Sequence, residues 1–123
     1  MITFWQDPVI RVGDITAERD YLDVRDVISG YMLLLEKGET SSVVNVCSGN
    51  ALPISEWLHR LLALSKTPIR IEIEPGLVYS QSNPRLVGDN TRLRGLGWTP
   101  RIPIDEMLSS LLDHWRSKIR ENP

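Results

Sequence analysis

Apolar and polar positions follow two different repeats along the chain, and each repeat predicts a different element. Residues 9–12 form a short, mostly β-branched run that ends at Gly13, which predicts a strand. Residues 23–37 carry apolar side chains at intervals of three and four, the repeat of an amphipathic helix. Asp23 can cap the start of this helix, and Gly38 is a natural stop.

The middle of the chain continues the alternation of strands and helices. Residues 43–47 are an apolar run whose β-branched content favours a strand buried on both faces, as in a parallel sheet. Pro53 suits the first turn of a following helix, because a proline at that position gives up no hydrogen bond. The apolar stripe of this helix consists of Trp57, Leu58, Leu61 and Leu62. Residues 69–73 alternate apolar and charged side chains, which predicts a half-buried strand.

The last third begins with a polar loop over residues 74–86 and ends in helices. Asp89 and Asn90 can cap a short helix that reaches Arg94, and a longer C-terminal helix begins at Pro103. The order of elements predicts an α/β fold: a partial sheet of about three short strands with three main helices, in a single domain over residues 1–123. Sheets usually have about four to six strands. The helix at 23–37 and the strand at 43–47 are therefore expected to be edge pieces of something larger.

Composition adds little beyond the class of a soluble globular protein. Hydrophobic residues make up 41% of the chain and charged residues 24%, with a formal net charge of −2. This charge gives no general attraction to nucleic acid or to an anionic membrane, and no apolar run approaches the length of a membrane span. The one cysteine, Cys47, cannot form an internal disulfide, which suits a reducing cytoplasm.

The motifs of common catalytic and cofactor sites are missing from the sequence. The eight glycines do not fit the G-x-G-x-x-G turn of a dinucleotide site, and there is neither a phosphate-binding P-loop nor a G-x-S-x-G elbow. His59 and His114 lie on the polar sides of their predicted helices and have no metal-ligand spacing to Cys47. We therefore expect no catalytic, cofactor-binding or metal-binding residue.

Charged residues crowd the stretch GDITAERDYLDVRDV, residues 13–27. Asp20, Asp23 and Asp26 stand around the predicted helix start, where capping and the helix dipole explain them without catalysis; Asp26, three places after Asp23, is a weak form of a capping box. Arg19 stands between acids on the loop that leads to this helix. The residues by themselves leave two interpretations of Arg19 open, a solvated turn and an anion site.

A resemblance to a known family favours the anion site. The stretches GDITAERDYLDVRDV, NVCSG, NPRLVGDNTRLRGLGWTPRIPIDEML and LLDHWR occur in this order. Together they resemble the C-terminal part of extended short-chain dehydrogenase/reductases, most closely the GDP-mannose 4,6-dehydratases and the GDP-6-deoxy-4-keto-mannose reductases. The resemblance implies a sugar-nucleotide-binding part without the N-terminal Rossmann part, which in the family carries the NAD(P) site and the catalytic Tyr-x-x-x-Lys pair. On this interpretation the chain alone binds no cofactor and is not catalytic.

The same resemblance implies roles for three residues. Arg19 matches the arginine that contacts the diphosphate of the sugar nucleotide, and a guanidinium suits this role because it can pair with two phosphate oxygens at once. Val12 and Gly13 match a strand end near the nucleotide base. Asp20 and Asp23 are expected either to orient Arg19 or to cap the helix.

One segment departs from the family pattern. Relatives have an R-P-x-D/E-V-P segment that supplies a second phosphate arginine and a carboxylate for the ribose. Aligned on Pro84, those places hold Tyr79 and Ser82, so the second clamp is missing. One charge-assisted contact contributes about 1.5–3 kcal/mol, which is insufficient alone for tight nucleotide binding.

Two functions from different classes follow. The first is the binding of a GDP-sugar by a part that is not catalytic alone. The second is a self-associating or partner-binding module derived from the same fold, because Val24, Val27, Tyr31 and the VVNVC run would expose apolar area if nothing covered them. The expected partners are a GDP-sugar and either a second copy of the chain or a Rossmann-containing protein. A complete stand-alone enzyme, which would have to bind NAD(P), is the least favoured alternative.

Overall fold

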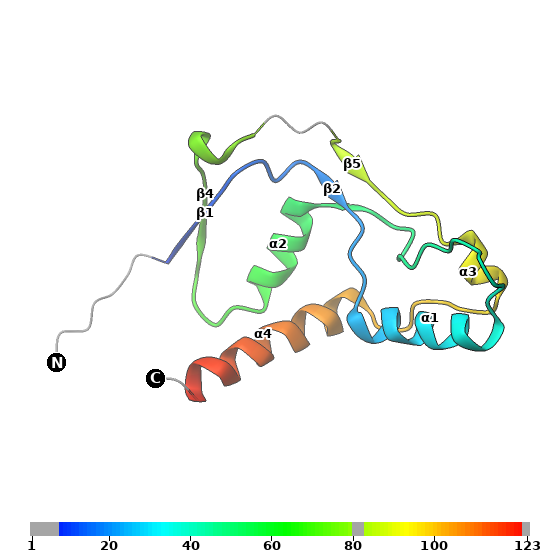
Figure 1. The fold of residues 1–123 in the computed structure, drawn as a ribbon. Helices are drawn as coiled ribbons and strands as arrows, with labels where there is room; N and C mark the ends of the chain where they lie inside the picture. Colours follow the sequence, from blue (N-terminus) through cyan, green and yellow to red (C-terminus); the bar gives the residue numbers. More distant parts are fainter. Residues whose placement is uncertain (1–7, 80–82, 122–123) are drawn as a thin grey trace.

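The computed structural model describes residues 8–79 and 83–121, and these form four helices and two small sheets. Figure 1 shows strands β1 and β4 at one end of the molecule with helix α2 beside them, and helices α1 and α3 at the other end. The elements are β1 (Val9–Val12), β2 (Glu18–Arg19), α1 (Val24–Lys37), β3 (Leu52–Pro53), α2 (Ile54–Ala63), β4 (Arg70–Ile73), the 3-10 turn η1 (Pro75–Leu77), β5 (Arg85–Leu86), α3 (Thr91–Gly95) and α4 (Ile104–Glu121). The mixed α/β fold expected from the sequence is confirmed.

The first sheet consists of two parallel strands. β1 pairs with β4 in the register Val9 to Arg70 and Val12 to Ile73. Both strands were predicted from their β-branched or alternating patterns, and both are found at the expected residues. Helices α2 and α4 pack against each other, with Trp57 of α2 and Leu108 of α4 buried.

The second sheet has three strands of two residues each, in the order β3-β2-β5. Arg19 of β2 pairs antiparallel with Leu52 of β3 and parallel with Leu86 of β5. The sequence did not predict these strands, because two residues are too few to display an apolar/polar repeat. This sheet places Arg19 between two neighbouring strands, β3 and β5.

The strand predicted at residues 43–47 is wrong. The segment has no strand assignment, and Val43 is 78% exposed rather than buried on both faces. A β-branched run forms a strand only where another strand offers N–H and C=O groups, and among the described residues none pairs with this segment. Polar side chains tie it down instead: Asn45 donates to the carbonyl of Asp89 (3.3 Å), and Arg92 donates to the carbonyl of Val43 (2.8 Å).

Helix α1 begins and ends where the sequence predicts. Asp23 caps it by accepting from the backbone N–H of Arg25 (2.8 Å), and the N–H of Gly38 donates to the carbonyl of Leu34 at the other end. Asp26 does not serve in the predicted capping box. Its carboxylate accepts instead from the backbone N–H groups of Arg101 and Ile102, far along the chain.

Helices α2, α3 and α4 also follow the sequence. Pro53 immediately precedes α2, and Asn90 is the N-cap residue of α3. The buried apolar side chains of the described residues are Ala17, Ala51, Trp57, Leu93, Trp98 and Leu108. None of the described helices has the length and apolarity needed to cross a membrane.

Candidate functional site

Arg19 is the residue around which the candidate site is built, and its backbone belongs to the β3-β2-β5 sheet. Its guanidinium donates to its neighbour's carbonyl, that of Glu18, at 2.7 Å, and to the carbonyl of Asn83 at 3.3 Å. The indole N–H of Trp57 donates to the carbonyl of Arg19 at 3.4 Å. Main chain and side chain of Arg19 are therefore both held by their surroundings.

A hollow of about 370 Å³ opens beside this arginine. It is lined by the end of β2, the chain before β3 and the chain after β5, namely Arg19, Asp20, Tyr21, Cys47, Leu86, Val87 and Gly88. Arg19 is only half-buried, so its charge is reachable from solvent. A half-buried guanidinium at the wall of an open hollow can pair with an anion such as a phosphate.

Asp20 contributes to the same hollow but does not share a described hydrogen bond with Arg19. Its carboxylate accepts from the backbone N–H groups of Ser48 (3.0 Å), Gly49 (2.9 Å) and Gly88 (3.1 Å), and from the Ser48 hydroxyl. Of the two roles open for the acids near Arg19, Asp23 has the capping role. Asp20 instead ties three segments of the chain together.

Asp23 forms a tight ion pair with Arg25, whose Nη2 lies 2.9 Å from Oδ2 of Asp23. The hydrogen bond from the Arg25 side chain holds the pKa of the Asp23 carboxyl below its ordinary value. The other end of the Arg25 guanidinium reaches Glu106 of α4 at 3.3 Å. This chain of charges connects the start of α1 to α4.

The structure places Val12 and Gly13 on a different wall from Arg19. Val12 lines an apolar groove of about 460 Å³ between β1, α2 and α4. Gly13 lies against η1, where an added Cβ would be 2.2 Å from the carbonyl oxygen of Leu77, so no larger residue fits. Tyr21 lines both the groove and the hollow at Arg19, which makes it the bridge between them. Tyr21 was not singled out from the sequence.

Asn83, beside the residues aligned with the missing second clamp, accepts from the Arg19 guanidinium. Tyr79 is 72% exposed, and Ser82 lies outside the described residues. Arg85 forms an ion pair with Glu18 (3.0 Å) and is not in the lining of the hollow. The described residues therefore give Arg19 no second arginine in the lining of its hollow.

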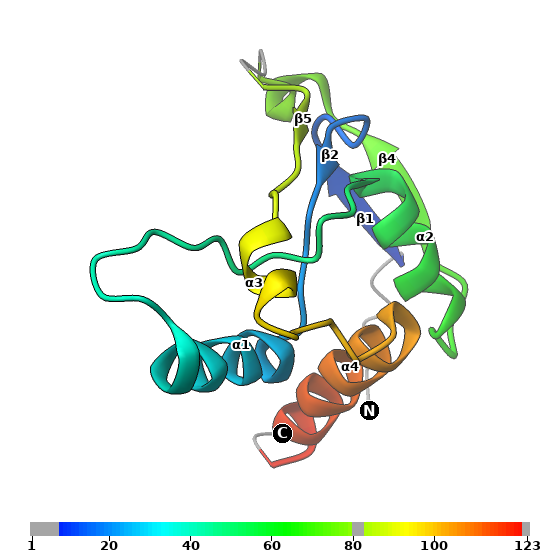
Figure 2. The ribbon, with the colours of Figure 1, turned by 90° about the vertical axis from the view of Figure 1, so that its right-hand side faces the viewer.

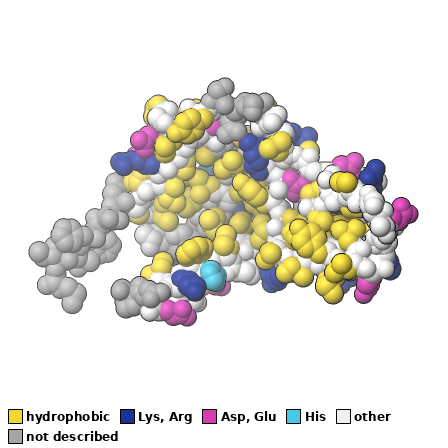
Figure 3. Space-filling view, viewed as in Figure 1, with side chains coloured by type: hydrophobic (Ala, Val, Ile, Leu, Met, Phe, Trp, Pro, Cys, Tyr) yellow, Lys and Arg dark blue, Asp and Glu magenta, His cyan; other side chains and the backbone are white. Residues whose placement is uncertain are grey.

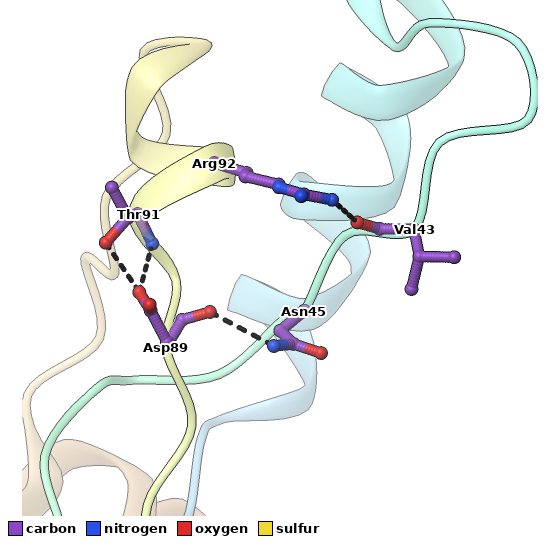
Figure 4. A pocket seen from close by; sticks show the side chains of 5 residues that line it. All are labelled: Val43, Asn45, Asp89, Thr91 and Arg92. Carbon is purple, nitrogen blue, oxygen red and sulfur yellow. Dashed lines mark hydrogen bonds between the residues drawn. The ribbon is translucent and has the colours of Figure 1, made fainter.

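A second polar hollow, of about 340 Å³, lies between residues 43–45 and the start of α3. Figure 4 shows the Arg92 side chain reaching from α3 to the carbonyl of Val43, and the Asp89 carboxylate turned back onto Thr91. The polar groups of this hollow bind one another. These hydrogen bonds attach the 43–47 segment to the start of α3.

The thiol of Cys47 also lines the Arg19 hollow. Burial raises the pKa of the Cys47 thiol, and the nearby negative charge of Asp20 raises it further. Cys47 is half-buried. The described residues contain no group of three His, Cys, Asp or Glu side chains that could hold a metal ion.

The described residues do not fit a dinucleotide cofactor. In residues 8–79 and 83–121 no strand passes through a glycine-rich turn into a helix, which is the cradle that a pyrophosphate requires. The backbone N–H groups that do converge, those of Ser48 and Gly49, are occupied by the carboxylate of Asp20. We derive no chemical step that involves NAD(P) on this chain.

Comparison with known proteins agrees with this geometry. A model of the GDP-mannose 4,6 dehydratase family matches residues 1–111. GDP-6-deoxy-D-mannose reductase of Pseudomonas aeruginosa is 38% identical over 113 residues, which cover 91% of this chain and 37% of the reductase. GDP-L-fucose synthase 1 of Arabidopsis thaliana is 28% identical over 103 residues, covering 82% of this chain and 31% of the synthase.

Solved structures show the same fold. RMD of Pseudomonas aeruginosa in complex with NADPH superposes with a TM-score of 0.85 at 36% identity, over 92% of this chain and 37% of RMD. UDP-glucose-4-epimerase of Stenotrophomonas maltophila, with bound NAD and formylated UDP-arabinopyranose, superposes with a TM-score of 0.78 at 22% identity, over 93% of this chain and 37% of the epimerase. The chain thus spans just over a third of the length of these proteins.

These matches confirm the resemblance to extended short-chain dehydrogenase/reductases that the sequence motifs indicated. They cover almost the whole chain, and they include the stretch that carries Arg19. The chain belongs to the GDP-mannose 4,6 dehydratase family.

Proposed function

We propose that this chain holds the diphosphate of a GDP-sugar at Arg19, as the substrate-binding part of an NAD(P)-dependent nucleotide-sugar dehydratase or reductase. The single observation that carries the proposal is the half-buried guanidinium of Arg19 at the wall of an open hollow. Family membership supports a nucleotide sugar as the ligand, and the relative at 38% identity, a GDP-6-deoxy-D-mannose reductase, supports the GDP form.

The proposal assigns no chemistry to this chain alone. Its described residues lack a cradle for the nicotinamide cofactor, so we propose that the cofactor is held by a separate Rossmann-containing part, encoded with this chain or supplied by a partner. Val12 and Gly13 are proposed to lie near the base. This rests on their place in the family pattern, and Tyr21 offers the physical connection between the groove beside Val12 and the hollow at Arg19.

Isothermal titration calorimetry with GDP and with GDP-mannose tests this proposal. We expect weak binding with a Kd of about 0.1–1 mM, or about 4–5.5 kcal/mol, because the Arg19 contact contributes only about 1.5–3 kcal/mol and the contacts proposed near Val12 and Gly13 must contribute the rest. Arg19→Ala should abolish the binding. Arg92→Ala is the matched control, since it removes an equal charge from the other polar hollow. The absence of any binding at millimolar GDP and GDP-mannose would contradict the proposal.

One observation favours a second candidate function, a module that binds a partner protein. The apolar face of α1 is exposed at Val24 (66%), Ile28 (54%), Tyr31 (57%), Met32 (56%) and Leu35 (82%). Figure 3 shows hydrophobic side chains gathered over this helix. A contiguous apolar face of this kind is typical of a protein–protein interface. The proposed partner is the Rossmann-containing part named above or a second copy of the chain.

Light scattering over a range of concentrations distinguishes the two forms of this second function. A dimer that Ile28→Glu and Leu35→Glu dissociate would assign the face to self-association. A monomer at high concentration would leave the Rossmann-containing partner, to be tested by adding the dinucleotide-binding part of a relative. Failure of both associations would remove this second function.

A further inference from the structure

We propose that Asp20 is a positioning residue for Arg19, and that its carboxylate holds together the three chain segments that place the Arg19 guanidinium at the hollow. This inference rests on the proposed binding of a diphosphate by Arg19. Asp20 itself is not proposed to touch the ligand. It acts by fixing the backbone from which Arg19 extends.

The sheet that carries Arg19 is too short to fix it unaided. Each of the strands β2, β3 and β5 has two residues, whereas strands in globular proteins usually have three to ten. Only one pair of residues on each side, Arg19 with Leu52 and Arg19 with Leu86, holds the arginine in register. Strand pairings of this length fray easily, so a further contact must hold the three segments together.

The Asp20 carboxylate supplies this tie directly after β2. One oxygen accepts from the N–H and the hydroxyl of Ser48, and the other accepts from the N–H groups of Gly49 (2.9 Å) and Gly88 (3.1 Å). Ser48 and Gly49 lie on the chain that leads into β3, and Gly88 lies just after β5. Four donors satisfy the acceptor sites of an ionised carboxylate. Asp20 therefore fastens both neighbours of β2 at once.

Close packing around this tie shows how tightly the segments are drawn together. A Cβ added to Gly88 would be 2.3 Å from the Sγ of Cys47, so only glycine fits there. Gly49 has a φ of +79°, a backbone conformation that places its N–H toward Asp20. Asn90 fixes the same turn from the other side by donating to the carbonyls of Cys47 and Ser48, both at 3.0 Å.

The hydrogen bonds of Asp20 also explain how its carboxylate can be stable in a hollow where an anion is proposed to bind. Two consecutive N–H groups that point at one place form a favourable site for negative charge. Here that site, together with the N–H of Gly88, is filled by Asp20, and the four donors offset its charge. The Asp20 carboxylate is therefore stabilised where it stands.

A double-mutant cycle separates positioning from a general loss of stability. We expect Asp20→Ala to weaken GDP binding about tenfold in the wild-type background and clearly less in an Arg19→Lys background, where binding is weaker but still measurable, because two residues that act through one contact are not additive. Asp14→Ala is the matched control: Asp14 is an acid of the same stretch, but the backbone N–H and hydroxyl of Thr16 are its nearby donors. Unchanged GDP affinity in folded Asp20→Ala would overturn the proposal.

Added formate gives a second readout, because formate is a carboxylate small enough to occupy the space that Asp20→Ala leaves. It should return the GDP affinity of Asp20→Ala toward the wild-type value and leave Asp14→Ala unaffected. A return of thermal stability without a return of affinity would assign Asp20 a purely structural role. If Asp20→Ala does not fold, Asp20→Asn, which keeps the volume and one acceptor oxygen, is used in the same cycle.

Nuclear magnetic resonance tests the positioning role of Asp20 independently of the proposed function. If wild-type protein binds neither GDP nor GDP-mannose, the proposed function fails, and the position of Arg19 is read from its Nε–H signal alone. A signal that moves in Asp20→Ala, together with the amides of Gly49 and Gly88, and that formate restores would support positioning by Asp20. An Arg19 signal identical in both proteins would overturn it.

Discussion

Helix α1 and the α2–α4 pair are built from the same kind of amphipathic sequence, yet they attach to the molecule in opposite ways. In the α2–α4 pair, each helix buries one large apolar side chain at the contact: Trp57 of α2 and Leu108 of α4 are both 7% exposed, although the C-terminal half of α4 exposes Leu111, Trp115 and Ile119. Trp57 also stacks edge-on against Tyr21, with ring centroids 5.3 Å apart. This pair is held mainly by the burial of apolar surface.

In α1 the buried residues are instead Asp26 and Gly30, and most of the large apolar side chains are exposed, namely Val24, Ile28, Tyr31, Met32 and Leu35. Figure 2 shows α1 beneath α3, with α4 diverging from it. The Asp26 carboxylate accepts from the N–H groups of Arg101 and Ile102, and its main-chain carbonyl accepts from the Trp98 indole at 3.2 Å. The difference teaches that an amphipathic pattern predicts a helix with one apolar face but does not say whether that face is covered.

Among the substitutions that test this comparison, the largest effect on stability is expected for Asp26→Ala. The Asp26 side chain is buried, and its loss leaves the part-buried N–H groups of Arg101 and Ile102 without their acceptor. We expect a loss of about 3 kcal/mol in the free energy of unfolding, at about 1.5 kcal/mol for each unsatisfied donor. Urea unfolding followed by tryptophan fluorescence measures it. The control, Asp105→Ala on the exposed side of α4, should change little, and equal stability of Asp26→Ala and wild type would show that α1 is not held in this way.

A matched pair of leucines compares the two helices directly. Leu108→Ala removes a side chain that is 7% exposed, whereas Leu35→Ala removes one that is 82% exposed. We expect a loss of about 2.5 kcal/mol for the first, from the lost transfer energy and the cavity. The second should stay within about 0.5 kcal/mol. Equal losses in urea unfolding would mean that the apolar face of α1 is covered in solution.

Gly30 gives the next largest effect and tests how closely α1 approaches its neighbours. A Cβ at Gly30 would lie 3.2 Å from Leu93 Cδ2 and 3.2 Å from Val46 Cγ1, so Gly30→Val forces this contact apart. We expect a loss of about 1.5 kcal/mol from overpacking. Gly30→Ala should be close to neutral, because its better helix propensity, about 1 kcal/mol, offsets the tight contact. Gly95→Val, where a Cβ has open space, is the control, and a Gly30→Val protein as stable as wild type in urea would contradict the close packing.

The comparison also shows which parts of the fold could be predicted from the sequence. β1, β4 and the four helices carry local signals: an apolar repeat, a cap such as Asp23, or a proline before the first turn. Such signals need no knowledge of the rest of the chain. The run at 43–47 carries an equally clear local signal, and there the prediction was wrong, because a strand also needs a partner and the described residues offer none.

The site could be predicted only in part, for the same physical reason. Arg19 was singled out through its family motif, and its neighbour Asp20 was expected either to orient it or to cap the helix. The bonds of Asp20 to Gly49 and Gly88 span 29 and 68 residues, and those of Asp26 to Arg101 and Ile102 span 75 and 76. No periodicity in the sequence reports contacts over such separations. Tyr21, which lines both the groove and the hollow, was missed because it joins surfaces that only the fold brings together.

The smallest effect concerns the point where α1 meets α4, the ion pair of Asp23 with Arg25. The Arg25 hydrogen bond lowers the pKa of Asp23 in the folded protein below the ordinary value of 3.8. A group with a lowered pKa contributes stability above its ordinary pKa and loses that contribution as the pH falls through the lowered value. Asp23→Asn keeps a good N-cap but removes this charge, so we expect a deficit of less than about 1 kcal/mol at pH 7. The deficit should shrink steadily below pH 3.8, in urea unfolding measured at a series of pH values. A deficit that stays constant down to the acid limit would mean that Arg25 stabilises α1 by packing and by its contact with Glu106, and not through the charge of Asp23.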